Sequence, residues 1–173
     1  LFFKKLIHMS FKQLLLVSSF VLCIKLNAQT TAIPDANFEQ RLIDLMIDTN
    51  GLNGNILDSD AQAVTNLTLT GSTITNFTGL EAFVNVVNLN LGNNSFATVP
   101  LSNLTLLETL KINDNDLLAS LDVSQNVLLK SIDVESNTSV NLTIPPITTL
   151  DLSNNVALES VRIVSFNNLS NVI

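Results

Sequence analysis

The sequence holds 173 residues with a formal net charge of −7, one histidine, one cysteine, and neither tryptophan nor tyrosine. Four of the eight basic residues, with His8 and Cys23, precede Gln29, whereas all 15 acidic residues follow it, so the chain from Gln29 onward carries a formal charge of −11. Without histidine or cysteine, that chain cannot form the usual catalytic triads, thiol nucleophiles or imidazole metal sites. Its charge would also repel nucleic acid, which we do not expect as a partner.

The N-terminal segment has the features of an export signal. Residues 14–24 are apolar apart from two serines, a lysine precedes them, and a short polar stretch around Ala28 follows. This order is typical of a signal peptide, and the apolar run is too short to span a bilayer. We predict a signal peptide over residues 1–28, and Met9 offers a second translation start that leaves the translation of residues 1–8 open. The mature chain is expected outside the cell or on its outer surface, without a membrane span.

Residues 29–63 are expected to form a helical N-terminal cap and a loop. Pro34 and Asp35 are helix-start signals. The apolar residues that follow helical spacing are Ile33, Phe38, Leu42, Leu45 and Met46. We predict one amphipathic helix between Ile33 and Ile47. The Asn-Gly pairs and acidic residues of the next stretch, DTNGLNGNILDSDAQ, predict a loop.

From Val64 onward, pairs of aliphatic residues separated by one residue recur in two interleaved series. The first series is Leu67/Leu69, Leu89/Leu91, Leu110/Ile112, Ile132/Val134 and Leu150/Leu152. The second series is Phe77/Gly79, Val99/Leu101, Leu121/Val123, Leu142/Ile144 and Val161/Ile163. Together they advance by about ten or eleven residues at a time, so two halves make a stacked coil of roughly 21 residues.

The spacing within each pair predicts short strands, because residues two apart in a strand point to the same side. Each coil then supplies two strands, and successive coils are expected to build two parallel sheets around one thin core. We predict a mostly β solenoid of about five coils over residues 64–173, preceded by one cap helix. The chain stops at Val172-Ile173 as another strand begins, so we expect the repeats to be truncated at the C-terminus.

Asparagines follow many of these pairs at the position where the chain turns inward. Their side-chain amides can satisfy backbone groups that the turn removes from the sheet, so we interpret them as a structural ladder rather than ligand contacts. The predicted ladder consists of Asn94, Asn115, Asn126, Asn137 and Asn155.

Several stretches resemble a known family. The strings LNLGNNSF, LDVSQN and LDLSNNVALESV resemble the leucine-rich repeat, in particular its short nested 21-residue class. The stretch IPDANFEQRLIDLMID is similar to the helical cap of exported bacterial surface proteins, and ITNFTGLEAFVNVVNLNL is similar to an internalin-like first repeat. The resemblance implies a recognition or adhesion scaffold that is not an enzyme and needs no cofactor.

The outward residues of the first series form the candidate binding surface: Thr68, Asn90, Lys111, Asp133 and Asp151. On adjacent coils, Asp133 and Asp151 would approach the carboxylate separation of retaining glycosidases, although two exposed acids beside Lys111 are more simply a charge ladder. Oxygen-rich stretches at residues 48–60 and 113–116 suit calcium only poorly, so we predict no metal site.

These observations leave three functional hypotheses. The first is a non-catalytic secreted or cell-surface module that binds a protein or a glycan through the outer face of a sheet. The second is a spacer or targeting region of a longer secreted protein. The third, least favoured, is a glycan hydrolase that depends on Asp133 and Asp151.

Overall fold

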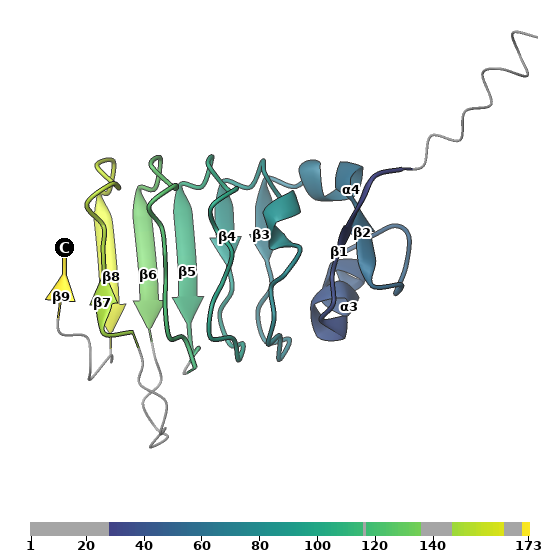
Figure 1. The fold of residues 1–173 in the computed structure, drawn as a ribbon, viewed down its shortest axis with the longest axis horizontal. Helices are drawn as coiled ribbons and strands as arrows, with labels where there is room; N and C mark the ends of the chain where they lie inside the picture. Colours follow the sequence, from purple (N-terminus) through teal and green to yellow (C-terminus); the bar gives the residue numbers. More distant parts are fainter. Residues whose placement is uncertain (1–27, 116, 136–146, 165–170) are drawn as a thin grey trace, which may run out of the picture.

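The computed structural model describes residues 28–115, 117–135, 147–164 and 171–173. It shows a row of stacked coils with a small N-terminal cap at one end (Figure 1). The coils share one five-stranded sheet in which every pairing is parallel. Its strands are β3 (Asn66–Thr68), β4 (Asn88–Asn90), β5 (Thr109–Asn113), β6 (Ser131–Glu135) and β8 (Ser160–Val164). This confirms the predicted mostly β leucine-rich-repeat solenoid. Residues 1–27 of the predicted signal peptide lie outside the described residues.

The cap begins with β1 (Thr30–Ala32), which pairs antiparallel with β2 (Asn55–Leu57). Between them lies α3 (Ala36–Asp44), the predicted helix, which starts where the side chain of Asp35 accepts hydrogen bonds from two backbone N–H groups of its first turn. The helix ends before Met46, which has a φ of 57° and is 88% exposed. Met46 was therefore wrongly assigned to the buried helix face.

The segment that was predicted as a loop after this helix contains two short elements. One is β2, and the other is α4 (Asp58–Gln62), which buries Ala61. The antiparallel pairing with β1 explains the strand β2. The strand β1 precedes the helix in the sequence, and its edge pairs with residues 55–57. The hydrophobic pattern of three-residue strands is too short to be recognised on its own.

The register of the five-stranded sheet stacks one aliphatic residue on the next, buried from β3 to β6 and 49% exposed at Val161 of β8. Leu67, Leu89, Leu110 and Ile132 follow one another as predicted, but the next partner of Ile132 is Val161 rather than Leu150. The step from β6 to β8 is 29 residues, against 22 between β3 and β4. The two predicted series therefore change places in this longer coil. Residues 136–146, which include the predicted Leu142/Ile144 pair, lie outside the described part.

The wall opposite this sheet is not the second regular sheet that the sequence predicted. Its aliphatic pairs are buried as expected, including Val99/Leu101 and Leu121/Val123. Within the described residues, however, the only strands on this side are β7 (Thr149–Leu150) and β9 (Asn171–Val172). Pro100 cannot donate a ladder hydrogen bond, and tight turns begin at once, with the Leu104 N–H bonded to the Leu101 carbonyl at 3.0 Å. The buried pairs thus hold the wall in place without a continuous ladder.

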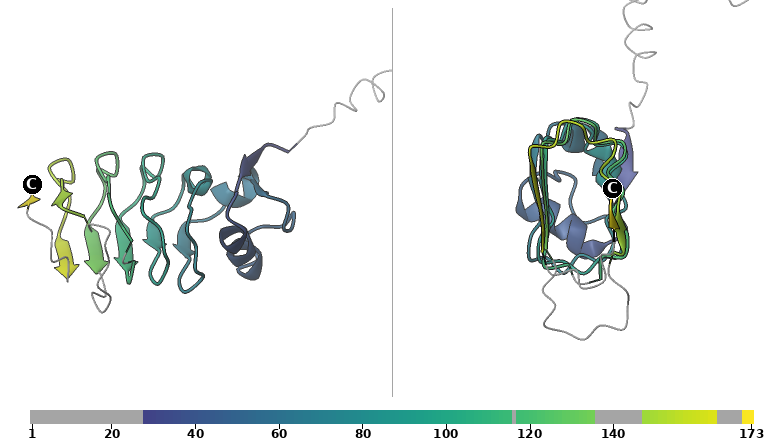
Figure 2. Two further views of the ribbon diagram at one scale, coloured as in Figure 1. Left: turned by 60° about the horizontal axis from the view of Figure 1, so that its bottom comes forward. Right: turned by 90° about the vertical axis from the view of Figure 1, so that its left-hand side faces the viewer.

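The core runs without a break from the cap into the coils. Viewed along the stack, the chain forms a narrow tube with two long walls joined by two turns (Figure 2). Rings connect the cap to the first coils: Phe38 of α3 meets Phe77 edge-on at 5.2 Å, and Phe77 meets Phe96 at 4.9 Å. All three rings are fully buried, so the cap and the repeats bury one another's apolar surface. No helix in the described part of the chain is long and apolar enough to cross a membrane.

Candidate binding face

The outward side chains of the five-stranded sheet form rows, because strands in register place equivalent residues side by side. One row consists of Thr68, Asn90, Lys111, Asp133 and Arg162. We call the exposed surface formed by the outward residues of β3, β4, β5, β6 and β8 the sheet face. Four of the five residues predicted for the binding surface lie in this row, and the fifth does not.

Asp151 is the residue that the sequence placed wrongly. It follows β7 on the opposite wall, where the Ser153 hydroxyl and N–H bond to its carboxylate and lower its pKa. Its acidic neighbour there is Asp122. Asp133 and Asp151 therefore stand on different walls and do not form the carboxylate pair that a retaining glycosidase needs. The error follows from the longer coil, which puts Arg162 beside Asp133.

Apart from Lys111, the N-terminal half of the sheet face is neutral and rich in hydrogen-bonding groups. A shallow depression of about 300 Å³ lies over β3, β4 and β5. Its lining residues are Asn66, Leu67, Thr68, Asn88, Leu89, Asn90, Thr109 and Lys111. Asn88 donates to the side-chain oxygen of Asn66 at 2.7 Å, and the Asn90 oxygen accepts the Gly92 N–H at 3.1 Å. Amides fixed in this way present their remaining groups to solvent in defined directions.

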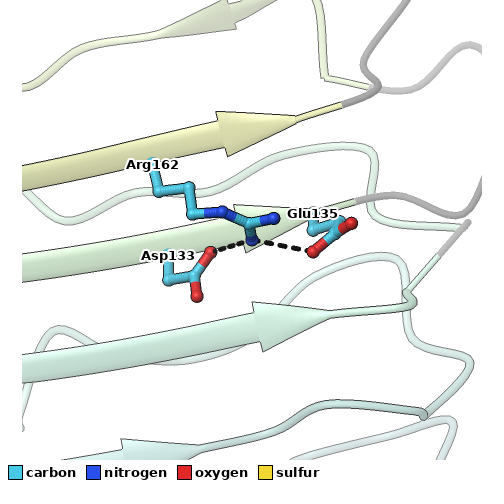
Figure 3. Close-up of polar contacts among 3 residues, drawn as sticks. All are labelled: Asp133, Glu135 and Arg162. Atoms are coloured by element: carbon cyan, nitrogen blue, oxygen red, sulfur yellow. Dashed lines mark hydrogen bonds and ion pairs between the residues drawn. The ribbon is translucent and has the colours of Figure 1, made fainter.

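The C-terminal half of the sheet face is charged but balanced. The Nη1 atom of Arg162 lies 2.8 Å from Asp133 Oδ1 and 2.7 Å from Glu135 Oε2 (Figure 3). Hydrogen bonds to Glu135 and Asp133 raise the pKa of the guanidinium further above its already high value. The contact joins β8 to β6 on the exposed side. Sequence reasoning missed Arg162 and Glu135, although the alternation in SIDVE and SVRIV places both on the side opposite to the aliphatic residues.

The asparagines form two ladders, one at each turn of the tube. Asn94 and Asn115 follow strands of the sheet, whereas Asn126 and Asn155 follow the opposite wall, and all four are buried. Asn115 Nδ2 donates to the Leu91 carbonyl of the previous coil at 3.0 Å. Asn155 donates to the carbonyl of Asn126 at 2.9 Å. Each amide thus caps carbonyls that the turn would otherwise leave unpaired.

In Asn94, both the nitrogen and the oxygen of the side-chain amide make hydrogen bonds to backbone groups. Asn94 Nδ2 donates to the Leu69 carbonyl at 2.6 Å, while its Oδ1 accepts the Ile74 N–H at 3.0 Å. These contacts occupy the amide with backbone and bury it, so it is not presented to a ligand. The predicted ladder residue Asn137 lies outside the described residues.

Acidic side chains in and beside the oxygen-rich loop of the cap, residues 48–60, are engaged by other groups of the protein. Glu39 is buried, and its Oε1 accepts the N–H groups of Asn53, Gly54 and Asn55 at 2.7–3.1 Å. Burial, with Coulombic repulsion from Glu39 and Asp60, raises the pKa of Asp48.

The cap is also fixed to the first coil. Asp35 uses one oxygen for the helix start and the other for Thr75 and Asn76. Burial alone would raise its pKa, but hydrogen bonds led by Thr75 lower it. Sequence reasoning identified Asp35 only as a helix start. Nothing in the local pattern around Asp35 indicates its contact 40 residues away.

The second oxygen-rich stretch lies at the turn after β5. The Asp114 N–H donates to the Glu135 carbonyl at 2.9 Å, and Asp116 lies outside the described residues. Across the described ranges, no cluster of three or more histidine, cysteine or acidic side chains could hold a metal ion.

The parallel sheet, the stacked aliphatic pairs and the asparagine turns define the fold as a leucine-rich-repeat solenoid. It is similar to the functional domain of InlJ from Listeria monocytogenes, a domain that includes a cysteine ladder, with 24% identity and a TM-score of 0.53 over 76% of this chain. It is also similar to the internalin InlF from Listeria monocytogenes, with 18% identity and a TM-score of 0.54 over 80% of this chain.

The chain spans 32% of the InlJ chain and 47% of the InlF chain, and at these identities the likeness shows the fold. No protein-family model and no curated protein matches the chain by sequence.

Proposed function

We propose that the chain from Gln29 onward is a non-catalytic surface module that binds a protein or a glycan with its sheet face. The distribution of charge is the observation that carries this proposal. The outward residues of the sheet hold two bases and two acids, Lys111, Arg162, Asp133 and Glu135, in a chain whose formal charge from Gln29 is −11. The sheet face therefore repels an anionic ligand less than the acidic excess of the whole chain would.

The shape of the sheet face supports the same proposal. Parallel strands in register give a rigid surface with repeated polar side chains, and repeated weak contacts add up for a ligand that is itself repetitive. The buried aliphatic row beneath the face fixes the positions of the outward residues. A ligand can then meet them with little loss of protein flexibility.

The lack of histidine and cysteine supports a binding role over an enzymatic one. From Gln29 onward the sequence has neither residue, and the neighbouring carboxylates of Asp133 and Glu135 are both bonded to Arg162. We further propose that residues 1–28 direct export, that residues 29–63 cap the solenoid, and that residues 64–173 form its repeats. Export would place the sheet face outside the cell.

A second candidate is that this region acts as a spacer or targeting arm within a longer secreted protein. The observation in its favour is that the similar solved chains are two to three times as long as the part that this chain covers. A spacer would show no saturable binding, whereas the binding module would.

The test compares two matched threonine substitutions on the two walls. Thr68 is exposed on the sheet face, and Thr98 is exposed beside the buried pair of the opposite wall. The purified chain from Gln29 is screened on arrays of extracellular proteins and glycans, and each saturable ligand is measured with Thr68→Arg and Thr98→Arg. We expect Thr68→Arg to weaken binding at least tenfold and Thr98→Arg to leave it unchanged. Equal effects of the two substitutions, or no saturable ligand, would count against the sheet face.

A further inference from the structure

We propose that the sheet face recognises a glycan that carries a carboxylate on one sugar, and that Lys111 is the residue that pairs with this group. The inference rests on the proposed function and concerns the same surface. It begins with Lys111, which is exposed on β5 near the middle of the sheet face. No ion pair in the described part of the chain involves it.

The neighbour that should pair with Lys111 is engaged elsewhere. Asp133 lies directly opposite Lys111 on the adjacent strand. Its Oδ1 is held at 2.8 Å by Arg162 from the strand on its other side, and the same Arg162 nitrogen also holds Glu135 (Figure 3). One arginine thus draws together both acids of the sheet face. Lys111 is left as the cation whose charge a ligand can complement.

The residues that line the depression beside Lys111 indicate which other groups the ligand carries. Its other polar lining residues are neutral amides and hydroxyls. The Thr68 and Thr109 hydroxyls and the Asn90 side-chain nitrogen make no hydrogen bond to another described residue, so they can serve a ligand rich in hydroxyl groups. One lysine fits one singly charged carboxylate, since lysine binds as a point charge without the planar fork of arginine.

A glycan fits this surface better than an acidic protein segment does. Protein interfaces are anchored by buried aromatic and arginine side chains. The described phenylalanines are all fully buried in the core, the chain has no tryptophan or tyrosine, and Arg162 is already bonded to two acids. A wet, polar contact made of many hydrogen bonds is what the depression offers instead.

The experiment measures three probes against the chain from Gln29: an oligosaccharide with one uronate sugar, its methyl ester, and a peptide with one glutamate and blocked ends. We expect the free acid to bind about threefold more tightly than the ester, as one exposed ion pair would give. Lys111→Gln should remove this preference without weakening the ester. Lys130→Gln is the matched control, because Lys130 is paired with Glu108 at 2.9 Å, and it should keep the preference.

The inference is overturned if the ester binds as well as the acid, if the preference survives Lys111→Gln, or if the glutamate peptide binds more tightly than the uronate oligosaccharide. Failure of the inference and failure of the proposed function are distinguishable. If neither glycan binds but an array ligand is lost in Thr68→Arg, the sheet face stands as a binding surface and the glycan assignment fails. If Thr68→Arg affects no ligand, the proposed function itself fails.

Discussion

The two walls of the tube carry the same inward pattern and yet differ in backbone structure and in outward chemistry. Both bury aliphatic pairs such as Leu110/Ile112 and Leu121/Val123. Only one wall joins five strands into a hydrogen-bonded sheet, and that wall holds Lys111 and Arg162. The comparison teaches that an aliphatic pair specifies which side chains enter the core but not whether the backbone forms a sheet. The outward residues decide what each wall can do.

Proline substitution should reveal the largest difference in stability between the two walls. Lys111 lies mid-strand with partner strands on both sides, so Lys111→Pro removes a ladder hydrogen bond and should lower the free energy of unfolding by about 3 kcal/mol. Asp122 occupies the equivalent place between Leu121 and Val123, and its N–H makes no backbone hydrogen bond in the described part of the chain. Asp122→Pro should cost about 1 kcal/mol or less. Urea denaturation measures both, and equal losses would mean that the walls do not differ.

Alanine substitution in the ladders sharpens the comparison, because the two turns are expected to behave alike where the walls do not. Asn115→Ala and Asn126→Ala each remove two hydrogen bonds to backbone carbonyls and should each cost about 1–3 kcal/mol. Asn103→Ala is the control, since exposed Asn103 makes one long contact of 3.4 Å. Thermal unfolding should show two similar losses and an unchanged control. A stable Asn126→Ala variant would remove the ladder from the account.

Asp35→Ala should have the smallest effect, about 1 kcal/mol, and it tests how the opposite wall is fixed at its first coil. Because hydrogen bonds lower the pKa of folded Asp35 below its usual 3.8, its stabilising contribution is present above that value and is lost as the pH falls through the folded pKa. The gap between the native chain and Asp35→Ala should therefore shrink in acid. Asp44→Ala, which replaces an exposed acid in the last turn of the same helix, is the control and should change stability by less than about 0.5 kcal/mol at pH 7. A gap that is constant from pH 7 to pH 2 would exclude the proposed role of the carboxylate.

Much of the fold follows from local rules that the sequence displays openly. The alternation around Leu67, Leu89, Leu110 and Ile132 correctly predicts the buried row of the sheet, because side-chain direction in a strand depends only on position. The helix start at Asp35 follows from capping chemistry in the same way. These features need no knowledge of distant contacts.

The errors arise where distant parts of the chain decide. Leu150 and Val161 both begin an aliphatic pair, so the pattern alone cannot tell which of them joins the sheet when one coil is 29 residues long. The wrong choice put Asp151 on the sheet face in place of Arg162. The strand β2 and the hydrogen bonds from residues 53–55 to Glu39 were missed because the partners come from different parts of the cap.

The central claim is that the sheet passes from β6 to β8, which places Arg162 beside Asp133 and leaves Lys111 for a ligand. Paired cysteines test it directly, because the chain from Gln29 has no native cysteine and adjacent strands bring Cα atoms within the range that a disulfide bridges. The double substitution Asp133→Cys with Arg162→Cys should form an intramolecular disulfide under mild oxidation, seen as a loss of two hydrogens by mass spectrometry. Asp133→Cys with Asp151→Cys should remain reduced. Rapid disulfide formation in the second variant and none in the first would contradict the account.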